Sequence, residues 1–115
     1  MPYELAADFS EFGPDELQTL RADGESPLVI DCRETEEVET ASIDGTRHVP
    51  MGDIKSRLPE LEDHADDLVV VLCHHGMRSL QVVGFLREQG FADARSLAGG
   101  IDRWSIEIDG SVPRY

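Results

Sequence analysis

The apolar run Leu68-Val69-Val70-Val71-Leu72 leads directly into the polar stretch Cys73-His74-His75-Gly76-Met77-Arg78-Ser79. The run is β-branched at its centre and has polar residues on both sides, which is typical of a strand buried on both faces of a parallel sheet. From Ser79 onward, apolar residues recur at roughly helical spacing, and Gly90 follows as a C-cap, so a helix is predicted there. Cys73 therefore lies in a strand-to-helix loop, at the carboxyl end of a central strand.

The rest of the chain alternates short strand and helix patterns. Pro14 and acidic residues predict the start of a first helix, which ends at Gly24. Further strands are expected at Leu28–Cys32, Thr46–Val49 and Ala94–Leu97, helical turns at Glu34–Thr40 and at Asp53–Asp63 with an interruption at Pro59, and a last helix from Gly99-Gly100 through Trp104. This alternation predicts an α/β fold with an open, mostly parallel sheet flanked by helices, which binds ligands at the carboxyl ends of its strands.

Length and charge limit the possible functions. With 115 residues and no linker, the chain is expected to form one domain over residues 1–115. Its 24 acidic and 10 basic residues give a formal charge of −14, which disfavours nucleic acid and anionic membranes as partners and is compatible with a cationic protein partner. We expect an acidic monomer that does not bind nucleic acid or membranes.

The two cysteines and the N-terminal residues predict the compartment. Cys32 and Cys73 are far apart and form no C-x-x-C pair, which argues against a disulfide scaffold or a zinc site and fits a reducing cytosol. Residues 1–8 include acidic side chains and no apolar segment typical of a signal peptide, and no run is long enough to span a membrane. A cytoplasmic location is therefore expected.

The loop after Cys73 has the groups that stabilise a thiolate. Backbone N–H groups of the loop and of the first helical turn are expected to point toward the sulfur, and the helix dipole and the cation of Arg78 add positive potential. Gly76 permits a positive φ in a tight loop. Cys73 is therefore interpreted as a nucleophile, against the alternative of a buried structural thiol.

The two histidines of the loop leave several interpretations open. His74 and His75 could contact a substrate as cations or hydrogen-bond donors, or one of them could face solvent. A metal site made of Cys73, His74 and His75 is disfavoured, because three consecutive residues rarely converge on a tetrahedral ion. For Arg78 the alternative to an anion contact is a surface salt bridge.

Together these residues resemble the active-site loop of the rhodanese-type sulfurtransferases, in which a cysteine opens a six-residue loop. The resemblance extends to Leu28-Val29-Ile30-Asp31-Cys32-Arg33-Glu34, to Ile43-Asp44-Gly45-Thr46-Arg47-His48-Val49-Pro50, and to Ala98-Gly99-Gly100-Ile101-Asp102-Arg103-Trp104. It covers roughly Gly13 to Tyr115 and is similar at its C-terminal stretch to the rhodanese domain of adenylyltransferase/sulfurtransferase proteins.

The resemblance implies a rhodanese-like sheet of five strands and a sulfurtransferase activity. Cys73 would carry sulfur as a persulfide, received from thiosulfate or a protein persulfide and passed to a nucleophilic acceptor such as a small sulfur-carrier protein. The substrate-binding residues would be His74, His75, Gly76, Met77 and Arg78, with no cofactor and no metal. Two alternatives are a phosphatase or arsenate reductase related to the same fold, and a binding module without activity. The five positions from Cys73 to Arg78 suit a sulfur atom better than a phosphate, for which the related loops are longer.

Four residues outside the loop also have expected places. The resemblance implies that Asp31 and Arg33 form a structural ion pair that braces the loops around the site. Cys32 is interpreted as a small buried side chain, with a resolving thiol as the alternative and with no disulfide to Cys73. Trp104 is expected in the core.

Overall fold

The computed structural model describes residues 11–115, so the predicted features of residues 1–8 lie outside the described part.

 In this part the strands are β1 Glu11–Phe12, β2 Leu28–Asp31, β3 Arg47–His48, β4 Val69–Leu72 and β5 Ala94–Leu97. The α-helices are α3 Pro14–Ala22, α4 Thr35–Thr40, α5 Leu58–Leu61, α6 Met77–Glu88 and α7 Gly100–Glu107, and the 3₁₀ turns are η1 Met51–Asp53 and η2 Glu62–His64.

The strands form one sheet in the order β1-β5-β4-β2-β3, and every pair in it is parallel. The buried run after Leu68 supplies β4, the central strand, whose four residues are all buried. β4 pairs with β2 in a register that places Asp31 opposite Leu72. The predicted open, parallel five-stranded sheet is confirmed, and its carboxyl edge places the residues after β2 and β4 side by side.

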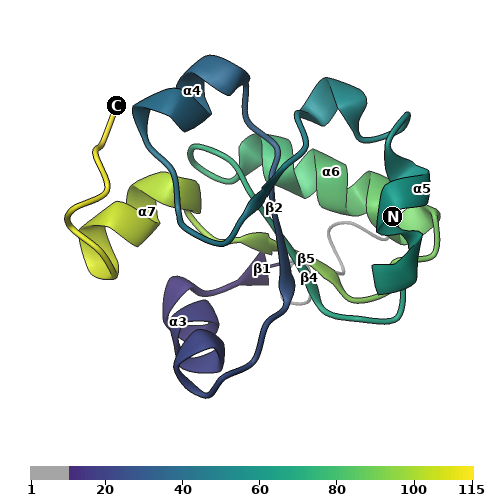
Figure 1. Cartoon of the computed structure of the whole chain (residues 1–115), viewed down its shortest axis with the longest axis horizontal. Coiled ribbons are helices and arrows are strands. Elements are labelled where there is room, and N and C mark those ends of the chain that lie inside the picture. The colour runs from purple at the N-terminus through teal and green to yellow at the C-terminus, as the bar shows by residue number, and fades with distance from the viewer. Residues whose placement is uncertain (1–10) are drawn as a thin grey trace.

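Helices cover both faces of the sheet, and the side chains of β4 alternate between the two layers. Val69, Val71 and Cys73 pack in the cluster on the face of α5 and α6, whereas Val70 and Leu72 pack in the cluster on the face of α3 and α7. Figure 1 shows α3 and α7 on one side of β2 and α5 on the other. Because of this alternation, the side chain of Cys73 points toward α6.

Several boundaries differ from those predicted. α6 begins at Met77 rather than at Ser79, because Gly76 already adopts the N-cap position. Pro59 does not interrupt a helix: it lies in the first turn of α5, where its missing N–H group has no intrahelical partner to lose. α7 continues beyond Trp104 to Glu107. None of the helices within residues 11–115 has the length and apolarity needed to cross a membrane.

Candidate functional site

Cys73 lies at the carboxyl end of β4, where the sequence predicts it. The residue is 1% exposed, and its sulfur is enclosed by the loop that leads into α6. The backbone N–H of Gly76 donates to Sγ at 3.0 Å, and the N–H of Ser79 donates to it at 3.4 Å. Two backbone donors thus converge on one sulfur atom, an arrangement that stabilises negative charge there without any movement of the chain.

Ser79 adds a hydroxyl group to the same environment. Its Oγ lies 3.3 Å from Sγ of Cys73, 3.1 Å from the carbonyl oxygen of Gly76, and 2.6 Å from the hydroxyl of Ser96 on β5. Both serines are fully buried. The Ser96 hydroxyl can donate to Ser79, which leaves the Ser79 proton available to the sulfur or to the Gly76 carbonyl.

Two glycines shape the loop. Gly76 has a φ of 108°, a left-handed value that glycine adopts without strain, and this turns its N–H toward the sulfur. Gly100 opens α7 with a φ of 63°, and a Cβ at this position would overlap the carbonyl oxygens of Cys73 and His74. The loop and the start of α7 therefore touch through their backbones.

The amino end of α7 holds the loop carbonyls away from the sulfur. The N–H of Ile101 donates to the carbonyl of Cys73 at 2.9 Å, and the N–H of Asp102 donates to that of His74 at 3.1 Å. These helical N–H groups have no partners within their own helix. Because the carbonyls are bound to α7, the N–H groups of the loop are left to face Sγ.

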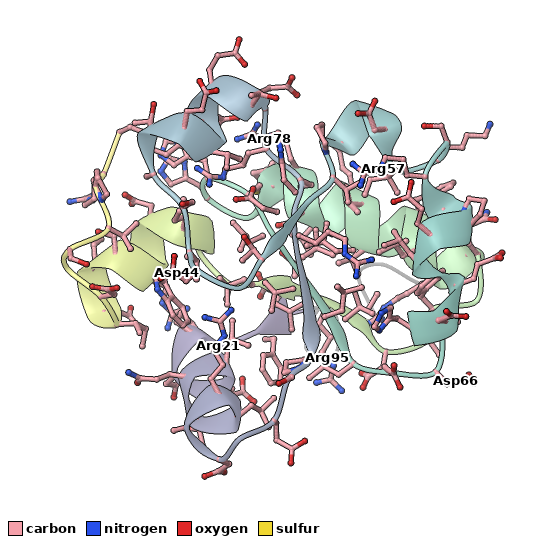
Figure 2. The ribbon with its side chains drawn as sticks, viewed as in Figure 1. Arg21, Asp44, Arg57, Asp66, Arg78 and Arg95 are labelled. Atoms are coloured by element: carbon pink, nitrogen blue, oxygen red, sulfur yellow. The ribbon has the colours of Figure 1, made fainter. Side chains whose placement is uncertain are left out.

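Arg78 stands at the end of the loop, but its guanidinium faces α4. Nη1 and Nη2 donate to the two carboxylate oxygens of Glu37 at 2.6 and 2.8 Å. The hydroxyl of Tyr115 donates to the same carboxylate at 2.8 Å. The hydrogen bond from Arg78 lowers the pKa of Glu37 to about 2, and the hydrogen bond to Glu37 raises the pKa of Arg78. Figure 2 shows Arg78 beneath α4, and Figure 1 shows the C-terminus beside the same helix.

Asp31 and Arg33 form the predicted ion pair, and both are fully buried. Arg33 donates to Oδ1 of Asp31 at 2.9 Å and to Oδ2 at 2.6 Å. Its remaining N–H groups bind the carbonyls of Glu37 and Ala41 and the hydroxyl of Tyr115. All five donors of the guanidinium are used. The pair connects β2, α4 and the C-terminal residue, which is a bracing role.

The histidines of the loop lie in a stack. The ring of His74 stacks on Tyr115 with centroids 3.9 Å apart and on His75 at the same distance. Burial is the main cause that lowers the pKa of His74, which favours its neutral form. The His75 side chain is 62% exposed, and Met77 is 74% exposed, so both lie at the outer rim of the loop.

The residues that could hold a metal differ from the disfavoured triplet. Within residues 11–115 the set with converging ligand atoms is His74, His75 and Asp102, whose atoms lie within 4.8 Å of one another. Asp102 is also bound by Arg114 at 2.7 Å. Cys73 is not part of this set.

Cys32 directly follows β2 and Cys73 directly follows β4, one residue beyond the last pair of the register, Asp31 and Leu72, and the N–H of Cys32 donates to the carbonyl of Leu72 at 3.0 Å. Both thiols are free. Burial, followed by the nearby Cys73 and Asp31, raises the pKa of Cys32 to about 12. Cys32 is therefore a neutral buried thiol, and Trp104 is 5% exposed in the core as predicted.

Sequence reasoning did not find Glu37, Ser79, Ser96 or Tyr115 as parts of the site. Ser79 follows the loop directly and had a local signal, because its N–H is a free donor of the first helical turn. Glu37 and Tyr115 reach the site only through the tertiary fold. The sequence separation between Arg33 and Tyr115 is 82 residues, which no periodic pattern covers.

Comparison with known proteins agrees with this geometry. The model of the family described as Rhodanese-like domain matches residues 13–107. The thiosulfate sulfurtransferase GlpE of Ectopseudomonas mendocina is 31% identical over 100 residues, which cover 85% of this chain and 86% of that protein. The adenylyltransferase and sulfurtransferase MOCS3-2 of Zea mays is 34% identical over 105 residues, 87% of this chain, but the match spans only 22% of the maize protein.

A solved structure gives the same picture at the level of the fold. The crystal structure of a rhodanese-related protein from Thermoplasma volcanium superposes with a TM-score of 0.75 at 28% sequence identity. The match covers 85% of this chain and 92% of the other.

Proposed function

The chain belongs to the rhodanese-like domain family, and we propose that it is a sulfurtransferase that carries sulfur as a persulfide on Cys73. One observation supports this proposal above the others. At the carboxyl end of the buried strand β4, Sγ of Cys73 accepts hydrogen bonds from the backbone N–H groups of Gly76 and Ser79. This environment suits an anionic sulfur nucleophile. It encloses one sulfur atom closely, which fits the transfer of a single sulfur.

The reaction has two half-reactions. The Cys73 thiolate attacks the outer sulfur of a donor, so that a bond from Sγ to that sulfur forms and the sulfur–sulfur bond of the donor breaks. The remainder of the donor leaves with the electron pair, as a thiolate from an alkyl persulfide or as sulfite from thiosulfate. A nucleophilic acceptor then attacks the outer sulfur of the persulfide and releases the Cys73 thiolate. The N–H groups of Gly76 and Ser79 stay directed at Sγ during both steps.

The donor and the acceptor are further parts of the proposal. Among the relatives, GlpE is a thiosulfate sulfurtransferase, and YrkF of Bacillus subtilis is a putative sulfur carrier protein. By analogy we propose a sulfane-sulfur donor and a small sulfur-carrier protein as one acceptor. We also propose the cytosol as the location, because the reaction needs Cys73 as a free thiolate.

Steady-state kinetics test the proposed function. The protein is assayed with thiosulfate and with cysteine persulfide as donors and cyanide as the acceptor, and parallel lines in double-reciprocal plots are expected for two half-reactions. Cys73→Ala should abolish transfer, and Cys32→Ala, the matched control at the neighbouring strand end, should retain it. Transfer that persists in Cys73→Ala would refute the assignment. Turnover of an aryl phosphate that is lost in Cys73→Ser would favour the phosphatase alternative instead.

A further inference from the structure

We propose that Glu37 makes the site selective for persulfide donors, R–S–SH, over thiosulfate, because its carboxylate pairs with the guanidinium of Arg78, the cation in the first turn of α6 at the end of the loop around Cys73. This inference rests on the proposed sulfurtransferase function and specifies the donor class. It assigns a specificity-determining role to a residue of α4, which lies outside the loop.

Glu37 is held in a fixed position by four hydrogen bonds. Its Oε1 accepts from Arg78 and from the backbone N–H of Glu34, and its Oε2 accepts from Arg78 and from the hydroxyl of Tyr115. The side chain is 20% exposed and that of Arg78 is 34% exposed, so the pair is partly shielded from solvent. A carboxylate bound on both oxygens and a guanidinium bound through both terminal nitrogens form a rigid, nearly neutral unit.

The other arginines around the loop are neutralised in the same way. Arg33 pairs with Asp31 at 2.6 Å, and Arg114 pairs with Asp102 at 2.7 Å. His74, next to the nucleophile, has a lowered pKa and tends to stay neutral. An anion that approaches Cys73 therefore meets paired cations, in a protein whose formal charge is −14.

The charges of the two donor classes differ. Attack of the Cys73 thiolate on thiosulfate brings three negative charges together, which end as a persulfide anion and sulfite. Attack on a protonated alkyl persulfide brings one negative charge, which leaves on the alkyl thiolate. In a site where the cations are already paired, the reaction with thiosulfate carries the larger electrostatic penalty.

The test compares donors in Glu37→Gln. Glutamine can still accept the hydrogen bond at the N3 position of α4, so the start of the helix is retained. The substitution removes the negative charge that pairs with Arg78. The control is Asp93→Asn, which also removes one carboxylate charge, here from the ion pair of Asp93 with Arg95. Asp93 directly precedes β5 and so lies at the amino edge of the sheet, opposite the edge that holds Cys73. Figure 2 shows Arg95 far from Arg78 in the view. For each protein, kcat/KM is measured with thiosulfate and with cysteine persulfide at one ionic strength, and persulfidated serum albumin tests a protein-borne source.

The wild-type protein should have a higher kcat/KM with cysteine persulfide or with the albumin persulfide than with thiosulfate. The faster of the two persulfides shows whether the sulfur comes from a small molecule or from a protein. Glu37→Gln should raise the thiosulfate-to-persulfide ratio of kcat/KM about tenfold, since a freed guanidinium regains a charge-assisted contact. Asp93→Asn should leave the ratio unchanged. A preference of the wild-type protein for thiosulfate would overturn the inference, and so would a thiosulfate-to-persulfide ratio in Glu37→Gln equal to that of the wild-type protein. In either case the sulfurtransferase function stands. Failure with every donor would instead refute that function.

Discussion

Substituting Gly100 by alanine tests whether the contact between α7 and the loop sets the position of the reacting sulfur. A Cβ at this residue would overlap the carbonyl oxygens of Cys73 and His74, and the φ of 63° is unfavourable for alanine. The substitution must therefore push the loop away from α7. The hydrogen bonds from Ile101 to Cys73 and from Asp102 to His74 would lengthen or break.

The expected loss of stability follows from two contributions. A left-handed φ at alanine costs about 1–2 kcal/mol. The loss of two backbone hydrogen bonds adds about 0.5–1.5 kcal/mol for each bond. The free energy of unfolding of Gly100→Ala should therefore fall by about 2–5 kcal/mol, a large share of the roughly 5–15 kcal/mol of a typical domain.

Two other glycines separate these contributions. Gly24 has a φ of 85° and open space around a Cβ, so Gly24→Ala reports the backbone strain alone. Gly52 has open space and no left-handed φ, so Gly52→Ala should change stability by less than about 0.5 kcal/mol or raise it slightly. Urea titrations give the three free energies.

Activity gives the second measurement for the same variants. Because a displaced loop no longer directs its N–H groups at Sγ, Gly100→Ala should form the Cys73 persulfide at least about tenfold more slowly, whereas Gly24→Ala and Gly52→Ala should match the wild-type rate. If Gly100→Ala is as stable as Gly24→Ala and reacts at the wild-type rate, the contact with α7 does not position the reacting sulfur.

Three further predictions follow from buried or paired groups. Arg33→Met leaves the buried carboxylate of Asp31 unpaired and should lower the free energy of unfolding in urea by about 3–5 kcal/mol, so a loss below about 1 kcal/mol would contradict the bracing role. Ser79→Ala removes the hydroxyl 3.3 Å from Sγ and should slow the alkylation of Cys73 by iodoacetamide several-fold at constant fold, as checked by circular dichroism; an unchanged rate would show that the hydroxyl does not act on the sulfur. The pKa of Glu37 is lowered from 4.5 to about 2, so its stabilising effect is complete above pH 4.5 and is lost as the pH falls toward 2. The stability advantage of the wild-type protein over Glu37→Gln should therefore shrink between these two pH values, and a constant advantage would contradict this assignment.

The parts of the fold that depend on local pattern could be predicted from the sequence. The apolar run of β4 fixed the place of Cys73, and the residues after it indicated a loop followed by a helix. β1 was not assigned, because its two residues are too few to show an alternation and it pairs only with β5, far along the chain.

The same limit applies to the site. The N–H donors of the loop were expected, because they follow from the chain direction at a strand-to-helix turn. The pairing of Arg78 with Glu37 was not, because the two residues are 41 positions apart in the sequence and meet only through the packing of α4 over the carboxyl edge of the sheet. Charged residues on a short surface helix carry no local signal for such a contact.

Whether Cys73 carries the transferred sulfur can be decided from the intact mass of the protein, because a persulfide adds one sulfur atom. The reduced wild-type protein, Cys73→Ala and Cys32→Ala are each incubated with cysteine persulfide and, separately, with thiosulfate. Their intact masses are then measured by mass spectrometry. If Cys73 carries the sulfur, an adduct of one sulfur atom should be present in the wild-type protein and in Cys32→Ala, be absent from Cys73→Ala, and be removed by cyanide. An adduct that persists in Cys73→Ala, or no adduct from either donor, would contradict this role of Cys73.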